Sequence, residues 1–159
     1  AIIEELAETK GLKHITCRLG TIFGTSPGMR FHTAVNKFCW QAVMGQSLTV
    51  WKTALEQKRP YLALDDAIRA ICLIFEKKLF DGRIYNVLTC NASVRDVVDA
   101  ITTFVPNVKI DLVDSQIMNQ LSYEVVSDRI KAQGFVVTNN LTVGIGETIE
   151  LLRNSNTRH

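Results

Sequence analysis

A short apolar strand that runs directly into a helix, within residues 58–71, constrains the fold of this chain more than any other stretch. Residues 61–64 are aromatic and aliphatic, which predicts a strand. Asp65 and Asp66 follow, where carboxylates cap the first N–H groups of a helix and face the positive end of its dipole. Arg59, at the start of the strand, carries a planar fork of donors suited to a phosphate or a carboxylate. The stretch is therefore either a plain strand–helix junction or a ligand-facing corner of the fold.

Strand and helix patterns alternate along the rest of the chain. Residues 1–10 have a helical pattern that ends near Gly11, and residues 14–19 have the pattern of a mostly buried strand. A polar connection separates the strand expected at 47–51 from the one expected at 59–64, which predicts a hairpin. Further helices are expected at 33–44, 65–78, 93–105, 127–133 and from 142 onward, and further strands at 83–88 and 109–113. This alternation predicts the α/β class.

The composition argues against several classes of function. Of the 159 residues, 47% are hydrophobic and 21% are charged, which suits a globular chain with a core. The net charge is +2 without a run of lysine and arginine, so we expect no nucleic acid partner. No apolar run approaches the roughly 20 residues that cross a bilayer, and the start has no signal-peptide pattern, so we expect no membrane partner and a cytoplasmic location. The four cysteines form no CxxC pair, so we expect reduced, buried thiols and no metal site.

The glycine-rich loop at residues 20–28 lies where a ligand edge is expected. It follows a strand, and α/β proteins bind ligands beyond the carboxyl ends of parallel strands. Neither GxGxxG nor GxxxxGK(S/T) is present, so a mere connection remains the alternative. No catalytic residue is predicted, because none of the three tyrosines has a lysine four residues later. Asp65 and Asp66 are adjacent on a helix start and point in different directions, which favours a cap over a catalytic pair.

Six motifs in order resemble one known family. Residues 18–24 (RLGTIFG) resemble the R-x-x-N-(V/I)-(Y/F)-G strand and loop of the extended short-chain dehydrogenases/reductases, and residues 59–66 (RPYLALDD) resemble the R-x-(F/Y)-(V/I)-x-(V/I)-D-D signature. The other matches are residues 46–51 (QSLTVW), 85–87 (YNV), 131–135 (KAQGF) and 143–149 (VGIGETI). Together they resemble the C-terminal half of the NAD-dependent nucleotide-sugar epimerases and dehydratases, over nearly the whole chain.

The resemblance implies a fold and a division of the chain. We expect the last strands and helices of a Rossmann-like doubly wound sheet, together with a small α/β substrate-binding lobe. Residues 1–28 would be the last part of the Rossmann half, with its helix, strand and substrate loop. Residues 29–159 would be the C-terminal substrate-binding lobe, with a Rossmann strand returning near 83–88. Because the chain starts inside a helical pattern with no cap, the N-terminal Rossmann half, with its glycine loop and Tyr-x-x-x-Lys pair, is expected to be missing.

The resemblance also implies site residues. Arg59 would bind the diphosphate of a nucleoside-diphosphate sugar, which fits its bidentate donors. Thr21 stands where the family has an asparagine near the substrate and the nicotinamide. Asn36 and Phe38 would contact the nucleotide of the substrate. Leu19 and Gly20 would line the nicotinamide side of NAD or NADP. Asp66 would cap its helix and brace the strand of Arg59 rather than touch the substrate.

Three functional hypotheses follow. In the first, the whole protein oxidises and re-reduces, or dehydrates, a nucleotide-linked sugar as a homodimer, and this chain alone is inactive. The second is a short-chain reductase of a non-nucleotide substrate, such as the threonine dehydrogenase branch with its similar MDDAIRA run. Arg59 argues mildly against it, because a diphosphate-binding arginine has less use there. The third is a non-catalytic binding or assembly module.

Overall fold

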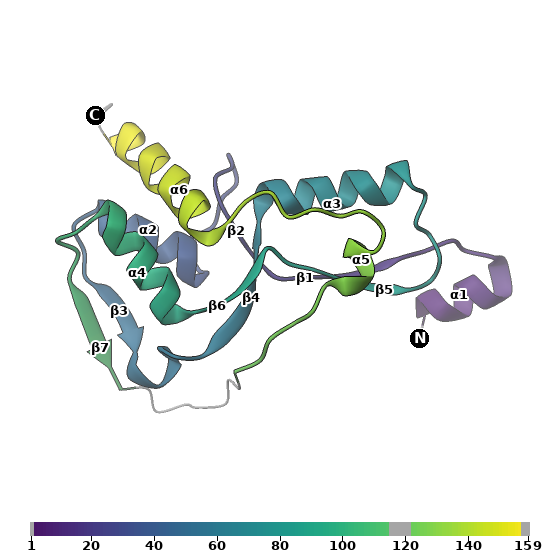
Figure 1. The fold of residues 1–159 in the computed structure, drawn as a ribbon, viewed down its shortest axis with the longest axis horizontal. Helices are drawn as coiled ribbons and strands as arrows, with labels where there is room; N and C mark the ends of the chain where they lie inside the picture. The colour runs from purple at the N-terminus through teal and green to yellow at the C-terminus, as the bar shows by residue number, and fades with distance from the viewer. Residues whose placement is uncertain (1, 115–121, 157–159) are drawn as a thin grey trace.

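The computed structural model describes residues 2–114 and 122–156. In chain order, its elements are α1 (Ile2–Lys10), β1 (Thr16–Leu19), β2 (Thr21–Phe23), α2 (Ala34–Val43), β3 (Leu48–Trp51), η1 (Lys52–Ala54), β4 (Lys58–Ala63), α3 (Leu64–Glu76), β5 (Ile84–Val87), β6 (Cys90–Ser93), α4 (Val94–Phe104), β7 (Ile110–Val113), α5 (Asp128–Lys131) and α6 (Leu141–Asn156). Figure 1 shows an elongated molecule, with α2, α4, α6, β3 and β7 at one end and α1 at the other.

The strands form three small sheets that are mostly parallel. Strand β4 lies between β2, to which it is parallel, and β6, to which it is antiparallel. Strand β1 pairs in parallel with β5, and β3 pairs in parallel with β7. Parallel strands joined through helices confirm the α/β class expected from the sequence.

The larger core cluster lies where α2, α4 and α6 pack on one another and on strands β2 to β4. Its most completely buried members include Phe23, Val35, Leu48, Val97, Ile101, Ile145 and Ile149. Helix α6 comes close to its neighbours through two glycines. A Cβ at Gly144 would lie 2.6 Å from the ring of Phe23, and one at Gly146 would lie 2.7 Å from the ring of Phe104. Both positions therefore require the absence of a side chain.

The smaller core cluster lies where α3 and α5 pack against β4 and β5. Its buried members are Leu62, Ala67, Ala70, Tyr85, Val87, Ile130 and Phe135. The opposite face of α3 is exposed, with Ile68 at 51%, Ile71 at 47% and Phe75 at 64% of full exposure. Among the described residues, α1 buries no side chain. In this part of the chain, α3 is thus packed on one face and exposed on the other, and α1 is mostly exposed.

The expected hairpin between residues 47–51 and 59–64 is wrong. Strand β3 pairs instead with β7, in the register Leu48 to Ile110, and β4 pairs with β2 and β6. The polar connection between β3 and β4 forms η1 rather than a tight turn. The local sequence pattern predicts that β3 pairs with the next strand, whereas its observed partner β7 lies about sixty positions further along the chain.

Strand β1 corrects a second expectation. It begins at Thr16, and all four of its residues are exposed rather than mostly buried. Cys17 lies on it and Cys72 lies on α3, and both residues are exposed, in contrast to the buried cysteines that we expected. Cys39 is buried, and burial raises the pKa of its thiol to about 12. Among the described helices, none has the length and apolar character needed to cross a membrane.

Helix starts are correct in one case and wrong in another. At α4, Ser93 Oγ accepts a hydrogen bond from the Asp96 backbone N–H and Asp96 accepts one from the Ser93 backbone N–H, which is the predicted capping box with aspartate as its acid. At α3 the capping position is Ala63, which has no side chain to offer. The cap expected from Asp66 is therefore wrong.

Candidate functional site

Strand β4 places successive residues in two cavities on its two sides. Arg59 and Tyr61 line one cavity of about 210 Å³, and Pro60 between them lines another of about 290 Å³. This is the alternation that a strand imposes on neighbouring side chains. Thr21 reaches the first cavity because β2 pairs with β4 in the register Thr21 to Tyr61. The structure therefore brings Thr21 and Arg59 together, as the sequence motifs implied.

Arg59 is half-buried at the border of its cavity. Its Nη1 donates to the carbonyl oxygen of Lys58 and its Nη2 donates to Oε1 of Gln57, each over 3.4 Å. Its guanidinium carbon lies 5.0 Å from the centre of the Tyr123 ring, within the range of a cation–π contact. A permanent positive charge with a flat donor surface thus borders the cavity.

Thr33 adds an unsatisfied oxygen to the Arg59 cavity. It precedes α2, and its side chain makes no capping hydrogen bond to that helix. The hydroxyl oxygen is buried and has no hydrogen-bond partner in the described part of the chain. A buried polar atom without a partner is costly, so the cavity favours a ligand with polar atoms here.

Leu19 and Gly20 line the second cavity together with Pro60, Leu88 and Tyr123. Gly20 is required by a close approach of two strands, since a Cβ there would lie 3.1 Å from the carbonyl oxygen of Pro60. Leu19 stays 44% exposed and presents an apolar wall. Arg18 and Asn86 also line this cavity, so it combines polar side chains with an aliphatic wall that suits one face of a planar ring.

Asn36 and Phe38 lie on α2 but differ in surroundings. Asn36 Oδ1 accepts a hydrogen bond from Gly24 N at 3.2 Å, and its Nδ2 donates to the carbonyl oxygen of Arg30 at 3.1 Å. These bonds hold the loop at residues 24–30, which lines a further cavity of about 430 Å³. Phe38 is only 6% exposed and packs in the larger core cluster. Asn36 therefore shapes the loop, and Phe38 stabilises the helix beneath it.

Asp66 is fully buried and joins three segments. Its carboxylate accepts hydrogen bonds from Thr89 Oγ1 at 2.7 Å and from the Thr138 backbone N–H at 3.1 Å, and it pairs with Arg69 at 3.0 Å. Thr89 Oγ1 in turn accepts a hydrogen bond from Ala63 N at 2.8 Å, at the end of β4. Asp66 thus braces the strand of Arg59 by way of Thr89 and does not line the Arg59 cavity. The sequence showed an acid at a helix start and did not indicate that it would be buried.

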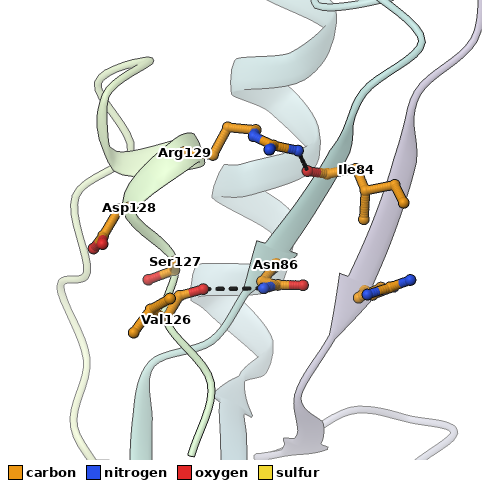
Figure 2. A pocket seen from close by; sticks show the side chains of 7 residues that line it. Ile84, Asn86, Val126, Ser127, Asp128 and Arg129 are labelled. Carbon is orange, nitrogen blue, oxygen red and sulfur yellow. Dashed lines mark hydrogen bonds between the residues drawn. The ribbon is translucent and has the colours of Figure 1, made fainter.

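A further cavity of about 540 Å³ lies over β1 and β5, as Figure 2 shows. Asn86 Nδ2 donates to the carbonyl oxygen of Val126 at 3.0 Å, and Arg129 Nη1 donates to that of Ile84 at 2.5 Å. Arg18 also borders it. None of the six residues expected to bind substrate or cofactor lines this cavity, although Arg18 and Asn86 line both it and the cavity of Leu19 and Gly20.

Several tyrosine and cysteine side chains among the described residues have raised pKa values. Burial raises the pKa of the Tyr61 phenol, and burial and the nearby Asp81 raise that of Tyr85. Burial also raises the pKa of the Cys17 and Cys90 thiols. These groups therefore hold their protons more firmly than in water. Within the described ranges, no three His, Cys, Asp or Glu side chains gather as a metal site would require.

A model of the NAD dependent epimerase/dehydratase family matches residues 1–87, more than half of the chain. The chain belongs to this family. The chloroplastic UDP-sulfoquinovose synthase of Spinacia oleracea is 38% identical over 74 residues, which cover 45% of this chain and 15% of that protein. These matches confirm the family that the ordered motifs indicated.

Solved structures share the fold of the family member described here. The dTDP-glucose 4,6-dehydratase of Bacillus anthracis in complex with NAD has a TM-score of 0.82 at 20% identity, over 99% of this chain and 50% of that one. The UDP-glucuronic acid 4-epimerase of Bacillus cereus in complex with UDP-glucuronic acid and NAD has a TM-score of 0.79 at 17% identity, over 97% and 49%. The chain spans about half the length of these structures, so it has the fold of part of a larger Rossmann-like protein.

Proposed function

We propose that this chain is the substrate-binding part of an NAD(P)-dependent epimerase or dehydratase that acts on a nucleoside-diphosphate sugar. The observation that carries the proposal is the meeting of Arg59 and Thr21 at one cavity, beside the unsatisfied hydroxyl of Thr33. The family match supports the class of reaction, and a related structure that contains UDP-glucuronic acid supports the class of substrate.

Each residue has a defined part in this proposal. Arg59 binds the diphosphate, because a guanidinium forms paired hydrogen bonds with phosphate oxygens. Thr21 places a hydroxyl next to the bound sugar nucleotide. Asn36 acts indirectly by holding the loop at residues 24–30, since both ends of its amide are already hydrogen-bonded.

The cavity of Leu19 and Gly20 fits one side of a nicotinamide cofactor. Its walls include the aliphatic side chain of Leu19 and the backbone at Gly20, and an aliphatic wall suits one face of a flat ring. When bound, the nicotinamide supplies hydride transfer. The sequence holds neither GxGxxG nor Tyr-x-x-x-Lys. Leu19 and Gly20 would therefore form one wall of the cofactor site, while other residues bind the phosphates of the cofactor and transfer the proton.

Titration calorimetry of the whole protein with UDP, dTDP and their glucose conjugates tests the proposal. We expect one of these ligands to bind. Arg59→Ala should weaken its binding about 10- to 100-fold, because hydrogen bonds between a guanidinium and a phosphate are stronger than those between neutral groups. Arg59→Lys is the matched control, which keeps the charge but loses the fork, and we expect an intermediate loss. No binding at millimolar ligand would overturn the nucleotide-sugar proposal in favour of a reductase of a non-nucleotide substrate.

The assembly and the activity are separate proposals. We propose that the whole protein is a homodimer, as the family resemblance implies, and light scattering of the purified protein tests it. We also propose that residues 1–159 alone do not turn over NAD. Turnover by this chain alone would refute that prediction, whereas nucleotide binding without turnover in the whole protein would favour a non-catalytic module.

A further inference from the structure

We infer that Tyr123 is a positioning residue that fixes the guanidinium of Arg59 for the diphosphate. The inference rests on the proposed function, since it assigns Tyr123 to the site that the diphosphate would occupy. Tyr123 lies far from Arg59 in sequence, and none of the motifs includes it. The fold brings the two side chains into contact.

The two side chains lie at the border between the two cavities. The guanidinium carbon of Arg59 is 5.0 Å from the centre of the Tyr123 ring. Arg59 lines the cavity that holds Thr21, and Tyr123 lines the cavity that holds Leu19 and Gly20. The stacked pair therefore sets where one cavity ends and the other begins.

The backbone that carries Tyr123 is held in place by hydrogen bonds to Lys58. Tyr123 N donates to the carbonyl oxygen of Lys58 at 3.3 Å, and Lys58 N donates to Ser122 Oγ at 3.0 Å. Lys58 Nζ pairs with Glu124 at 2.6 Å, which raises the pKa of the lysine. These contacts bind residues 122–124 to the residue next to Arg59, so ring and guanidinium are tied to the same point of β4.

Two more contacts extend this attachment to the neighbouring strands. Val125 N donates to Asn91 Oδ1 at 3.0 Å, and Asn91 Nδ2 returns a bond to the carbonyl oxygen of Val125 at 2.9 Å. Asn86 Nδ2 donates to the carbonyl oxygen of Val126. The segment at residues 122–126 is thus anchored to β4, β5 and β6, and this anchored backbone places the Tyr123 side chain beside Arg59.

Stacking suits an arginine that must bind a diphosphate. An arginine side chain has several rotatable bonds, and its ordering opposes binding. Among the contacts of Arg59, the hydrogen bonds to Lys58 and Gln57 are long, at 3.4 Å each, and each of these two is weak. An aromatic face restrains the plane of the guanidinium without using its N–H edge, where phosphate oxygens bind.

The test compares four variants of the whole protein by UDP calorimetry, namely two at Tyr123, Arg59→Ala and one double variant. Tyr123→Leu removes the π face, and we expect UDP to bind roughly two- to fivefold more weakly, the range that an exposed cation–π contact supports. Tyr123→Phe keeps the face and is expected to bind UDP as the unchanged protein does. Tyr123→Leu added to Arg59→Ala is expected to cause no further loss, because the two residues act as one unit. Thermal unfolding checks that each variant remains folded.

The outcomes separate this inference from the proposed function. If the unchanged protein does not bind UDP, dTDP or their sugar conjugates, the proposed function and the inference fall together. If Arg59→Ala weakens binding but Tyr123→Leu does not, only the inference is wrong. An equal loss in Tyr123→Phe also overturns it, because the hydroxyl would then be a ligand contact. Without ligand, we expect the Arg59 side-chain resonance in NMR to shift in Tyr123→Leu, and an unchanged resonance contradicts the stacking.

Discussion

The helix-covered end of the molecule and the part around β1 and β5 have similar sequence patterns but differ in how completely their apolar side chains are buried. Around α2, α4 and α6, apolar faces meet one another and the residues of the larger core cluster are buried. Around β1, α1 and α3, the chain forms the same kinds of element, yet α1 buries nothing and α3 leaves Ile68, Ile71 and Phe75 exposed. An apolar pattern specifies the type of an element, whereas its burial depends on what packs against it.

The largest expected effect is the difference in stability loss between the same substitution, Ile→Ala, on α6 and on α3. Ile149 on α6 is 1% exposed and Ile71 on α3 is 47% exposed. We expect Ile149→Ala to cost about 2–5 kcal/mol of unfolding free energy, because it removes packed methyl groups and leaves a cavity. Ile71→Ala makes the same change in helix propensity, and in this chain we expect it to cost under about 0.5 kcal/mol. Urea unfolding measures both, and equal losses would mean that α3 is as firmly packed as α6.

A smaller effect tests whether the α3 region has a polar anchor of its own. Asp66→Asn leaves Thr89, Thr138 and Arg69 with a neutral partner, and we expect a loss of about 1–3 kcal/mol. Asp65→Asn is the neighbouring control on the same turn of α3, where the side chain is exposed, and we expect little change. Denaturant titration of both variants measures the difference. A cost as small for Asp66→Asn as for Asp65→Asn would show that Asp66 does not anchor this region.

The smallest effect lies at the start of α4 and depends on pH. Hydrogen bonds from the backbone N–H and the hydroxyl of Ser93 hold the pKa of Asp96 below its ordinary value of 3.8. Because the folded-state pKa is lowered, this stabilisation is complete above the ordinary value and is lost as the pH falls through the folded value. We expect Ser93→Ala to cost about 1 kcal/mol near neutral pH and less in acid. Unfolding at about pH 6 and about pH 3 measures the change, and a cost that is the same at both contradicts the capping box.

Sequence patterns predicted the types of most elements because helix caps and apolar spacing are local. The capping box at Ser93 and the strand of Arg59 follow from neighbouring residues alone. Pairing was not local, so the partner of β3 was missed. Strand β6, with the sequence CNAS, lacks strand-forming residues and exists because it pairs with β4.

The candidate site was only partly predictable for the same reason. Arg59 and Thr21 were chosen by family resemblance, and the register of β2 on β4 brings them to one cavity. Tyr123 has no pattern around it that indicates a role, because its place depends on hydrogen bonds to Lys58 from a segment more than sixty positions away. Burial of Asp66 depends on Thr89 and Thr138, which also lie far along the chain.

The alternation of Arg59 and Pro60 across β4 makes this strand sensitive to length in a way that point substitutions do not reveal. A single inserted or deleted residue within β4 would reverse every side chain that follows it in the strand. Such a change at Lys58 would turn Arg59 toward the cavity of Leu19 and the proline ring toward Thr21. Among natural variants of this chain, we therefore expect exchanges of residue type along β4 to outnumber changes in its length.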